Sequence, residues 1–307
     1  MITQHELAQA ISLLKAGKLI AFPTETVYAL AGDATNLSAI LKIFSLKQRP
    51  LSQPLSVLLP EGYPMGRWAS DIPEVAEKLA ERFWPGPLTL VLKKEKSILP
   101  ELTGGQAKIG LRVPDHPIAQ TLLSSFAGGV AAPSANRWAQ LSPTQINHVR
   151  SEFDQELELI IDGGPCSMGI ESTIIDVTFD VPRILRLGAL SLAQIESVTP
   201  YEIEKFTLSP RFSKKPLIKQ VSQQVLADIL DNDLSHYPTL TVFSLSAAKK
   251  QHKNLTWIHM PSEANQYGQK LYQYLHASKS MSNNILVESV PKLKAWASIQ
   301  LILDQHT

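Results

Sequence analysis

Short apolar runs alternate with segments of helical periodicity along about the first 200 of the 307 residues. The runs, rich in branched and aromatic residues, predict strands at 19–22, 55–59, 88–93, 109–113, 129–132, 157–161, 172–177 and 182–185. Apolar residues at helical spacing between them predict helices at 36–46, 72–83, 117–126 and 143–153. Several connections are too short for helical crossovers, so strands of both directions should share one sheet. The alternation therefore predicts an α/β fold over residues 1–200, a twisted mixed sheet flanked by helices.

The rest of the chain predicts a second, smaller domain, because 307 residues exceed one typical core. Residues 201–236 differ from the rest in composition, because basic residues recur from Lys205 to Lys219 without an acidic residue between them. We interpret 201–236 as a solvated linker, and the alternative is a flap over a bound nucleotide. The last segment, 237–307, indicates a small Rossmann-like α/β domain. Its predicted elements are strands at 240–243 and 284–287, a helix around 263–275 and another from 291.

Charge and cysteine content limit the possible partners. The net charge is +1, which provides no general surface for polyanions, so a phosphate site must be local. Cys166 is the single cysteine, which excludes an internal disulfide and indicates a reducing compartment. The N-terminal segment does not read as a signal peptide, and no run approaches the ~20 apolar residues that cross a bilayer. We therefore expect a cytoplasmic protein without a membrane partner.

Two cations close to a hydroxyl-rich turn are the strongest chemical signal. An apolar strand breaks at Pro23 into a turn with two threonines, and a predicted helix ends near Lys47 and Arg49. Residues two apart diverge by roughly 200° on a helix. Lys47 and Arg49 can therefore converge only if the helix ends there, as the following Pro50 indicates. The pattern favours a grip on a polyphosphate together with a polar small molecule, and the alternative is a solvated charge pair at a helix C-terminus.

Further polar residues lie at the ends of predicted strands. Arg112 and Arg186 follow apolar runs, in positions that more often face a cleft than open solvent. Ser134 and Asn136 lie among small residues that let a ligand approach the backbone, although turns often contain such pairs. Ser142 has capping-box spacing and is expected to N-cap the following helix, and a helix N-terminus also attracts anions.

The sequence lacks the common signatures of nucleotide folds and metal sites. It has no Walker pattern, no Rossmann fingerprint and no zinc-ligand spacing, and Cys166 has no histidine nearby in the sequence. Residues 162–173 combine a Gly-Gly turn with hydroxyls that open the next predicted strand, which is either a tight turn or part of a site. The residues alone therefore predict a site that positions a phosphate-bearing ligand and stabilises charge without a protein nucleophile.

Three short motifs are specific in combination. They read Pro-Thr-Glu-Thr-Val-Tyr at 23–28, Lys-Gln-Arg-Pro at 47–50 and Ser-Ala-Asn at 134–136. They resemble signatures of the YrdC/TsaC family of threonylcarbamoyl-adenylate synthases, in its longer two-domain form. The resemblance extends over 19–190 through further blocks at 84–89, 111–117, 162–165, 169–173 and 184–186. It implies a YrdC-like sheet and the conversion of L-threonine, bicarbonate and ATP to threonylcarbamoyl-AMP and pyrophosphate, for threonylcarbamoyladenosine formation at position 37 of tRNA.

The resemblance also implies roles for individual residues. The residues expected to contact L-threonine are Thr26, Leu58, Arg112, Ala132 and Ser172. Those expected to contact ATP are Lys47, Arg49, Gln53, Lys108, Ser134, Asn136, Ser142 and Arg186. Lys47 and Arg49 would be the catalytic residues, because they would neutralise charge that grows on the phosphates. Mg²⁺ would accompany ATP without direct protein ligands, and a separate tRNA threonylcarbamoyl-transferase complex would receive the product.

The chain departs from the family pattern at several positions. Ala29 stands where glycine usually follows the tyrosine, Leu58 stands where the long form often has histidine, and Leu187 replaces a proline before Gly188. The linker motif of the long form has no full match here. Two alternatives remain: a module that binds RNA, even weakly, through the same basic concavity, and an inactive relative. The net charge of +1 weighs against the first, and the intact cation and Ser-Xaa-Asn motifs weigh against the second.

Overall fold

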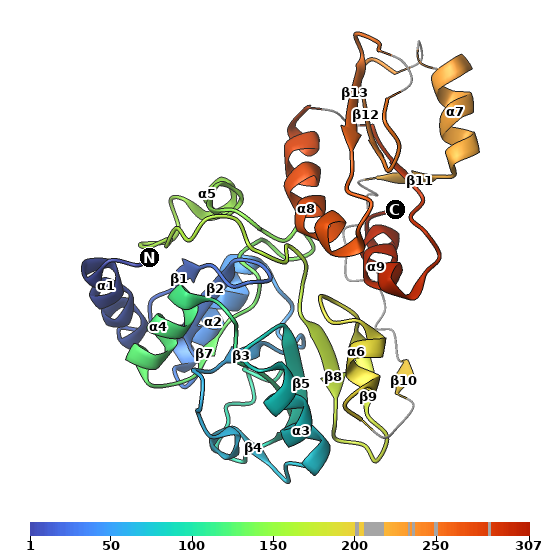
Figure 1. Cartoon of the computed structure of the whole chain (residues 1–307). Coiled ribbons are helices and arrows are strands. Elements are labelled where there is room, and N and C mark those ends of the chain that lie inside the picture. The colour runs from blue at the N-terminus through green and yellow to red at the C-terminus, as the bar shows by residue number, and fades with distance from the viewer. Residues whose placement is uncertain (200–202, 206–217, 233, 235–236, 249–250, 282–283) are drawn as a thin grey trace. The chain divides into compact units, whose positions relative to one another are not determined.

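The computed structural model describes residues 1–199, 203–205, 218–232, 234, 237–248, 251–281 and 284–307. Its contacts divide the chain into two compact units, Met1–Leu208 and Ser209–Thr307 (Figure 1). The predicted boundaries at 200 and 237 differ from this division. Part of the predicted linker, 219–232, forms a strand and a helix, because the strand pairs into the sheet of the second unit. Arg211, Lys214 and Lys215, three basic residues of that linker, lie outside the described residues.

The first unit is built on a ten-stranded sheet. Its strands are β1 (Ile20–Phe22), β2 (Ala29–Asp33), β3 (Ser56–Leu58), β4 (Ala69–Ser70), β5 (Leu88–Lys94), β6 (Lys108–Arg112), β7 (Val130–Ala131), β8 (Thr173–Asp176), β9 (Arg183–Arg186) and β10 (Glu204–Lys205). Their order is β1-β2-β7-β3-β6-β5-β8-β9-β10, and β4 pairs with β5. The β3–β6, β5–β8 and β9–β10 pairs are parallel, whereas the other pairs are antiparallel. The predicted mixed sheet is therefore confirmed.

Helices cover both faces of this sheet. They are α1 (Gln4–Lys15), α2 (Leu37–Lys47), α3 (Glu74–Phe83), α4 (Pro117–Phe126), α5 (Ile146–Phe153), α6 (Leu192–Glu196) and the 3-10 turn η1 (Met65–Arg67). Side chains along β1 alternate between two hydrophobic clusters. Ile20 and Phe22 join a cluster with residues of α1 and α4, which lie side by side in Figure 1. Ala21 joins the cluster that contains residues of α2 and α3, so both faces of the strand are buried.

Most predicted elements of this unit are confirmed, and the differences have local causes. Helix α4 has the predicted bounds, since Pro117 is favoured at the first helical position. Strand β2 was not predicted, because its residues, Ala-Leu-Ala-Gly-Asp, are weak strand formers. The strand predicted at 157–161 forms only a single bridge, between Ala21 and Ile160. The predicted N-cap at Ser142 is wrong: α5 begins at Ile146, and the Ser142 hydroxyl instead donates a hydrogen bond to Glu171.

The second unit is a small parallel α/β sheet with the order β11-β14-β12-β13. Its elements are β11 (Lys219–Val221), α7 (Gln223–Asn232), β12 (Leu240–Ser244), β13 (Leu255–His259), α8 (Ala264–Met281), β14 (Ile285–Glu288), η3 (Lys294–Trp296) and α9 (Ala297–His306). The Rossmann-like prediction is confirmed by this all-parallel sheet, although β11, α7 and β13 were not predicted. Among the described residues, no helix combines the length and apolar character needed to cross a membrane.

The backbone around Gly188 leaves no room for a side chain. A Cβ atom there would lie 2.2 Å from the Glu171 carbonyl oxygen and 2.5 Å from the Ser172 carbonyl carbon, and backbone cannot move aside cheaply. We therefore expect Gly188→Ala to lower the free energy of unfolding by about 1–3 kcal/mol, measured by urea denaturation followed by circular dichroism. The matched control is Gly66→Ala, because nothing lies within 4 Å of a Cβ at that position. Equal stability of the two variants would contradict this packing argument.

Candidate active site

The turn between β1 and β2 is held by its own hydroxyls and is fully buried. Thr24 Oγ1 accepts hydrogen bonds from the backbone N–H groups of Thr26 and Val27, both at 3.2 Å, and donates to the Val27 carbonyl at 2.7 Å. The Thr24 and Thr26 hydroxyl oxygens lie 2.9 Å apart. The turn therefore has one defined shape, and the Thr26 hydroxyl is fixed within it.

Tyr28 joins this turn to two other segments that the sequence analysis singled out. Its hydroxyl donates to the Gly164 carbonyl at 2.8 Å and accepts from the Gly163 N–H at 3.3 Å, which places the Gly-Gly turn against it. Burial raises the pKa of Tyr28, so the phenol stays neutral and can donate. Its backbone carbonyl accepts from the Ala135 N–H at 2.8 Å, and its N–H donates to the Pro143 carbonyl at 2.8 Å. The motifs at 23–28, 134–136 and 162–165 thus form one framework.

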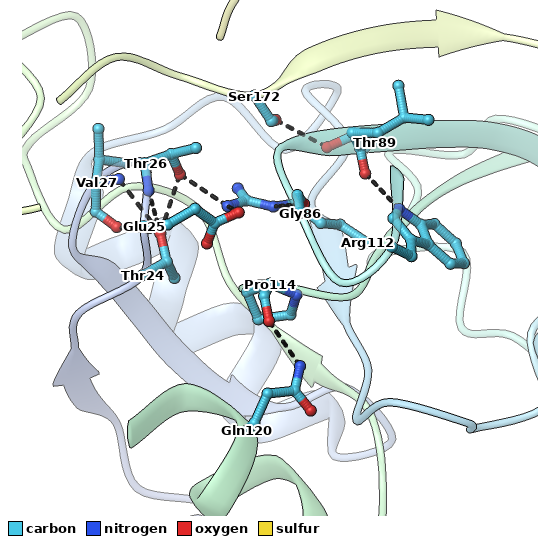
Figure 2. A network of polar contacts seen from close by, with 12 residues as sticks. Thr24, Glu25, Thr26, Val27, Gly86, Thr89, Arg112, Pro114, Gln120 and Ser172 are labelled. Atoms are coloured by element: carbon cyan, nitrogen blue, oxygen red, sulfur yellow. Dashed lines mark hydrogen bonds and ion pairs between the residues drawn. The ribbon is translucent and has the colours of Figure 1, made fainter. Parts of the chain in front are cut away.

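Arg112, at the end of β6, points into this turn (Figure 2). Its Nη2 donates to Thr26 Oγ1 at 2.9 Å and lies 2.7 Å from Glu25 Oε1, and its Nε donates to the Gly86 carbonyl at 3.2 Å. Arg112, Thr26 and Glu25 are all buried. The structure therefore brings together the predicted threonine contacts Arg112 and Thr26. It adds Glu25, a residue inside the quoted motif to which the sequence reasoning gave no role.

Ser172 and Arg186 form a second contact pair next to the first. Ser172 Oγ lies 2.8 Å from Thr89 Oγ1, and Figure 2 shows both hydroxyls above the bend that contains Gly86. Arg186, on β9, donates from Nη2 to Ser172 Oγ at 3.1 Å and to the Ser172 carbonyl at 2.8 Å, with Nε also on that carbonyl at 3.0 Å. A predicted threonine contact and a predicted ATP contact therefore touch each other.

Lys47 ends α2 and points into the segment that follows β7. Its Nζ donates to the carbonyl oxygens of Ser134, at 2.5 Å, and of Asn136. Only 1% of Lys47 is exposed. This burial, together with the nearby charge of Arg49, lowers the pKa of Lys47 well below its ordinary value. Asn136 donates from Nδ2 to the Arg137 and Gln140 carbonyls, so the Ser-Xaa-Asn motif holds Lys47 through its backbone.

The helix ends between Lys47 and Arg49, as the sequence predicts, and the charge of Arg49 acts on the buried Lys47 ammonium. Gln48 adopts a left-handed conformation with φ of 53° and closes α2. Arg49, half-buried, donates from Nε to the Gln53 carbonyl at 3.2 Å and from Nη2 to the Pro54 carbonyl at 2.7 Å. Its guanidinium carbon lies 4.5 Å from the centre of the Trp138 ring. Gln53, a predicted ATP contact, thus meets Arg49 through its backbone.

The remaining predicted residues divide into those near these groups and one apart from them. Ser142 Oγ donates to Glu171 Oε1 at 2.6 Å. Glu171 directly precedes Ser172 in the chain. Ala132 donates its N–H to the Ser56 carbonyl at 2.9 Å. Leu58 lies in register with Arg112 but packs into the hydrophobic cluster with α1 and α4.

Lys108 is the predicted residue that no described contact joins to the others. It lies at the opposite end of β6 from Arg112, and four residues of strand span about 13 Å. Its ammonium pairs with Asp176 Oδ2 at 2.7 Å and lies 4.0 Å from the centre of the Phe179 ring. Lys108 therefore forms an ion pair at the far end of the strand from Arg112.

The arrangement suits an anionic ligand next to a small polar one. The side chains of Lys47, Arg49 and Arg186 each donate to a backbone carbonyl, which holds the charged group in a defined direction. In the part of the chain that the structure describes, no three His, Cys, Asp or Glu side chains gather as a metal site would need.

Comparisons with known proteins agree on one family. Residues 12–188 match the Sua5/YciO/YrdC family, described as Telomere recombination. The threonylcarbamoyl-AMP synthase of Pyrococcus abyssi is 44% identical over 197 residues, which are 64% of this chain and 58% of that protein. The corresponding protein of Bacillus subtilis is 40% identical over 202 residues, 65% of this chain and 58% of that protein. The chain thus matches less than two thirds of the length of these curated relatives.

The similarity to a solved structure extends over both units. The crystal structure of P. abyssi Sua5 complexed with L-threonine aligns with 100% of this chain and 95% of that chain. The sequence identity is 30% and the TM-score is 0.89. The α/β fold predicted for the first 200 residues, and the added C-terminal domain, therefore follow a known two-domain architecture.

The single thiol should be inert in the native protein. Cys166 is 2% exposed, and burial, reinforced by the charge of Glu25, raises its pKa to about 12. Only the thiolate reacts readily, and the raised pKa leaves Cys166 almost entirely protonated at pH 8. We expect a chromogenic disulfide reagent to modify native Cys166 at least about 100-fold more slowly than the urea-unfolded chain. Cys166→Ser gives the zero of the assay, and rapid modification of the native thiol at pH 8 would contradict the buried position.

Proposed function

The chain belongs to the Sua5/YciO/YrdC family, and from this premise we propose that it is a threonylcarbamoyl-AMP synthase. The proposed substrates are L-threonine, bicarbonate and ATP, and the products are threonylcarbamoyl-AMP and pyrophosphate. The observation that carries the proposal is the contact of Arg186 with Ser172. It joins a cation suited to phosphate to a hydroxyl suited to an amino acid within one hydrogen-bonded framework.

The amino-acid half of the proposal rests on Arg112, Thr26 and Ser172. A guanidinium binds a carboxylate with defined geometry, and two buried hydroxyls beside it can each donate or accept. The similar structure from P. abyssi is a complex with L-threonine, which supports this choice of amino acid. Ala132 and Leu58 would supply backbone and apolar contacts nearby.

The nucleotide half rests on the carbonyl-held cations. ATP would contact Lys47, Arg49 and Arg186, together with Ser134, Asn136 and Ser142. Burial lowers the pKa of Lys47 in the free protein. The negative charge of bound phosphates would stabilise the ammonium form, so binding would raise that pKa. Gln53 would support Arg49 through its carbonyl. Mg²⁺, when bound with ATP, would shield phosphate charge; its ligands would be phosphate oxygens and water.

The chemistry needs no protein nucleophile. The threonine amine combines with bicarbonate, losing water, to form a carbamate. A carbamate oxygen then forms a bond to the α-phosphorus of ATP, and the bond from that phosphorus to the bridging oxygen breaks. The electron pair leaves with pyrophosphate, where Lys47 and Arg49 would stabilise the charge. The closeness of three bound substrates would supply much of the rate, because it replaces bimolecular encounters.

The product would serve the modification of adenosine 37 in tRNA through a separate threonylcarbamoyl-transferase complex. A cytoplasmic location, expected from the single cysteine, fits a reaction that uses ATP. The alternative of an RNA-binding module gains no support from the net charge of +1.

Pyrophosphate release by the purified full-length chain tests the proposed function. The assay contains ATP, Mg²⁺ and bicarbonate, with and without L-threonine, and mass spectrometry identifies the adenylate. We expect pyrophosphate release that depends on L-threonine, together with the mass of threonylcarbamoyl-AMP. ATP binding without turnover under these conditions would refute the synthase activity and favour an inactive relative.

Removal of the Arg49 guanidinium should affect turnover far more than stability. We expect Arg49→Ala to lower kcat by about 100-fold or more, the usual loss when one group that stabilises transition-state charge is removed. The thermal midpoint is expected to stay within about 3 °C, because Arg49 is only half-buried. The matched control is Arg67→Ala, an exposed arginine on η1. An unchanged kcat in a folded Arg49→Ala protein would remove Arg49 from the mechanism.

A further inference from the structure

Glu25 has a carboxylate that the chain buries almost completely but satisfies only in part. The residue is 2% exposed, and its Oε1 lies 2.7 Å from Arg112 Nη2. Neither carboxylate oxygen accepts a well-aligned hydrogen bond from a described residue. Glu25 is the only acidic residue in this condition within the described part of the chain. Its backbone carbonyl, by contrast, accepts from the Met168 N–H at 2.8 Å, so the spare capacity belongs to the side chain.

A buried carboxylate with open acceptor positions is costly unless a donor reaches it. An ionised carboxylate offers about four lone-pair positions, and Arg112 lies at one of its two oxygens. The neighbouring His116 does not supply a second cation at neutral pH, because burial lowers its pKa. Cys166 stays protonated for the same reason, since burial raises its pKa to about 12. The carboxylate of Glu25 can therefore accept a further hydrogen bond from a donor outside the chain, preferably a cationic one.

The guanidinium of Arg112 has N–H donors left over for a ligand. Its Nε and Nη2 are used by Gly86, Thr26 and Glu25, whereas its Nη1 makes no hydrogen bond to a described residue. One buried pair thus presents unused N–H donors on the guanidinium and unused acceptors on the carboxylate. A zwitterionic α-amino acid carries the matching groups, a carboxylate and an ammonium on adjacent bonds. Its binding would add no net charge to the buried site, which matters because uncompensated buried charge is strongly unfavourable.

We infer that Glu25 binds the α-ammonium group of the amino acid whose carboxylate binds Arg112. The inference rests on the proposed function and adds to it the residue that recognises the amine. Glu25 would act in two ways. Its carboxylate holds Arg112 in place, and it selects ligands that carry an ammonium group. A 2-hydroxy acid of the same shape would meet Arg112 but leave Glu25 without its cation.

The test compares two ligands on four full-length proteins by isothermal titration calorimetry without ATP. The ligands are L-threonine and (2S,3R)-2,3-dihydroxybutanoate, in which a hydroxyl replaces the amine. The proteins are the wild type, Glu25→Gln, Glu25→Asp and the matched control Glu158→Gln. Like Glu25, Glu158 pairs with a cation, in this case Lys18, but its side chain is 52% exposed, so its replacement should change neither affinity.

We expect the wild type to prefer L-threonine by about 30-fold or more, the scale for a buried charge pair. Glu25→Gln should weaken L-threonine by a similar factor and change the hydroxy acid by less than about 3-fold. Glu25→Asp keeps the charge and should restore part of the preference. Equal weakening of both ligands in a folded Glu25→Gln protein would overturn the inference, because Glu25 would then act only on Arg112.

The wild-type comparison keeps the inference falsifiable if Glu25→Gln does not fold. A wild type that binds both ligands equally would overturn the role of Glu25 on its own. The proposed function has a separate readout: a wild type that makes threonylcarbamoyl-AMP but shows no preference for the amine rejects only the inference about Glu25. A wild type that neither binds L-threonine nor releases pyrophosphate rejects the proposed function as well.

Discussion

The buried ammonium of Lys47 fixes the relation between the two halves of the candidate site. Its hydrogen bonds to the Ser134 and Asn136 carbonyls hold the segment after β7 against the end of α2. That segment in turn pairs with the backbone of Tyr28, which positions the turn that contains Thr26. Because the ammonium is almost fully buried, loss of either carbonyl would leave one of its N–H donors without a partner. Lys47 therefore helps to hold the two segments in place.

Backbone carbonyls fix the direction of three cations in the candidate site. Lys47, Arg49 and Arg186 each donate to at least one carbonyl oxygen. Hydrogen bonds from charged donors are stronger than those from neutral ones, so each side chain is held in a defined direction. A net charge of +1 provides no general surface for polyanions, so on the proposed function the phosphates of ATP would have to meet local cations such as these.

The sequence predicts best where local rules and tertiary structure agree. The end of α2 between Lys47 and Arg49 was predictable, since two cations two residues apart need a helix end to serve one site. The N-cap at Ser142 was not, because a local capping signal was overridden by a hydrogen bond to Glu171, a residue distant in sequence. The role of Glu25 was not predictable for a related reason. Its carboxylate oxygens lack hydrogen-bond donors, which can be recognised only once the burial of the side chain is known. The strand β11 was hidden because its pairing with β14 is non-local.

The contrast between Arg112 and the other cations divides the site electrostatically. Arg112 lies against the carboxylate of Glu25, so that pair is neutral and suits a zwitterion. Lys47, Arg49 and Arg186 donate to backbone carbonyls, and on the proposed function they would meet the phosphates of ATP. The bound ammonium group must lose a proton to water before it combines with bicarbonate, so formation of the carbamate replaces a positive group by a negative one, which Glu25 would repel and the cations would attract. On the proposed function, the change of charge during the first step would itself drive the carbamate towards the α-phosphate that it must attack.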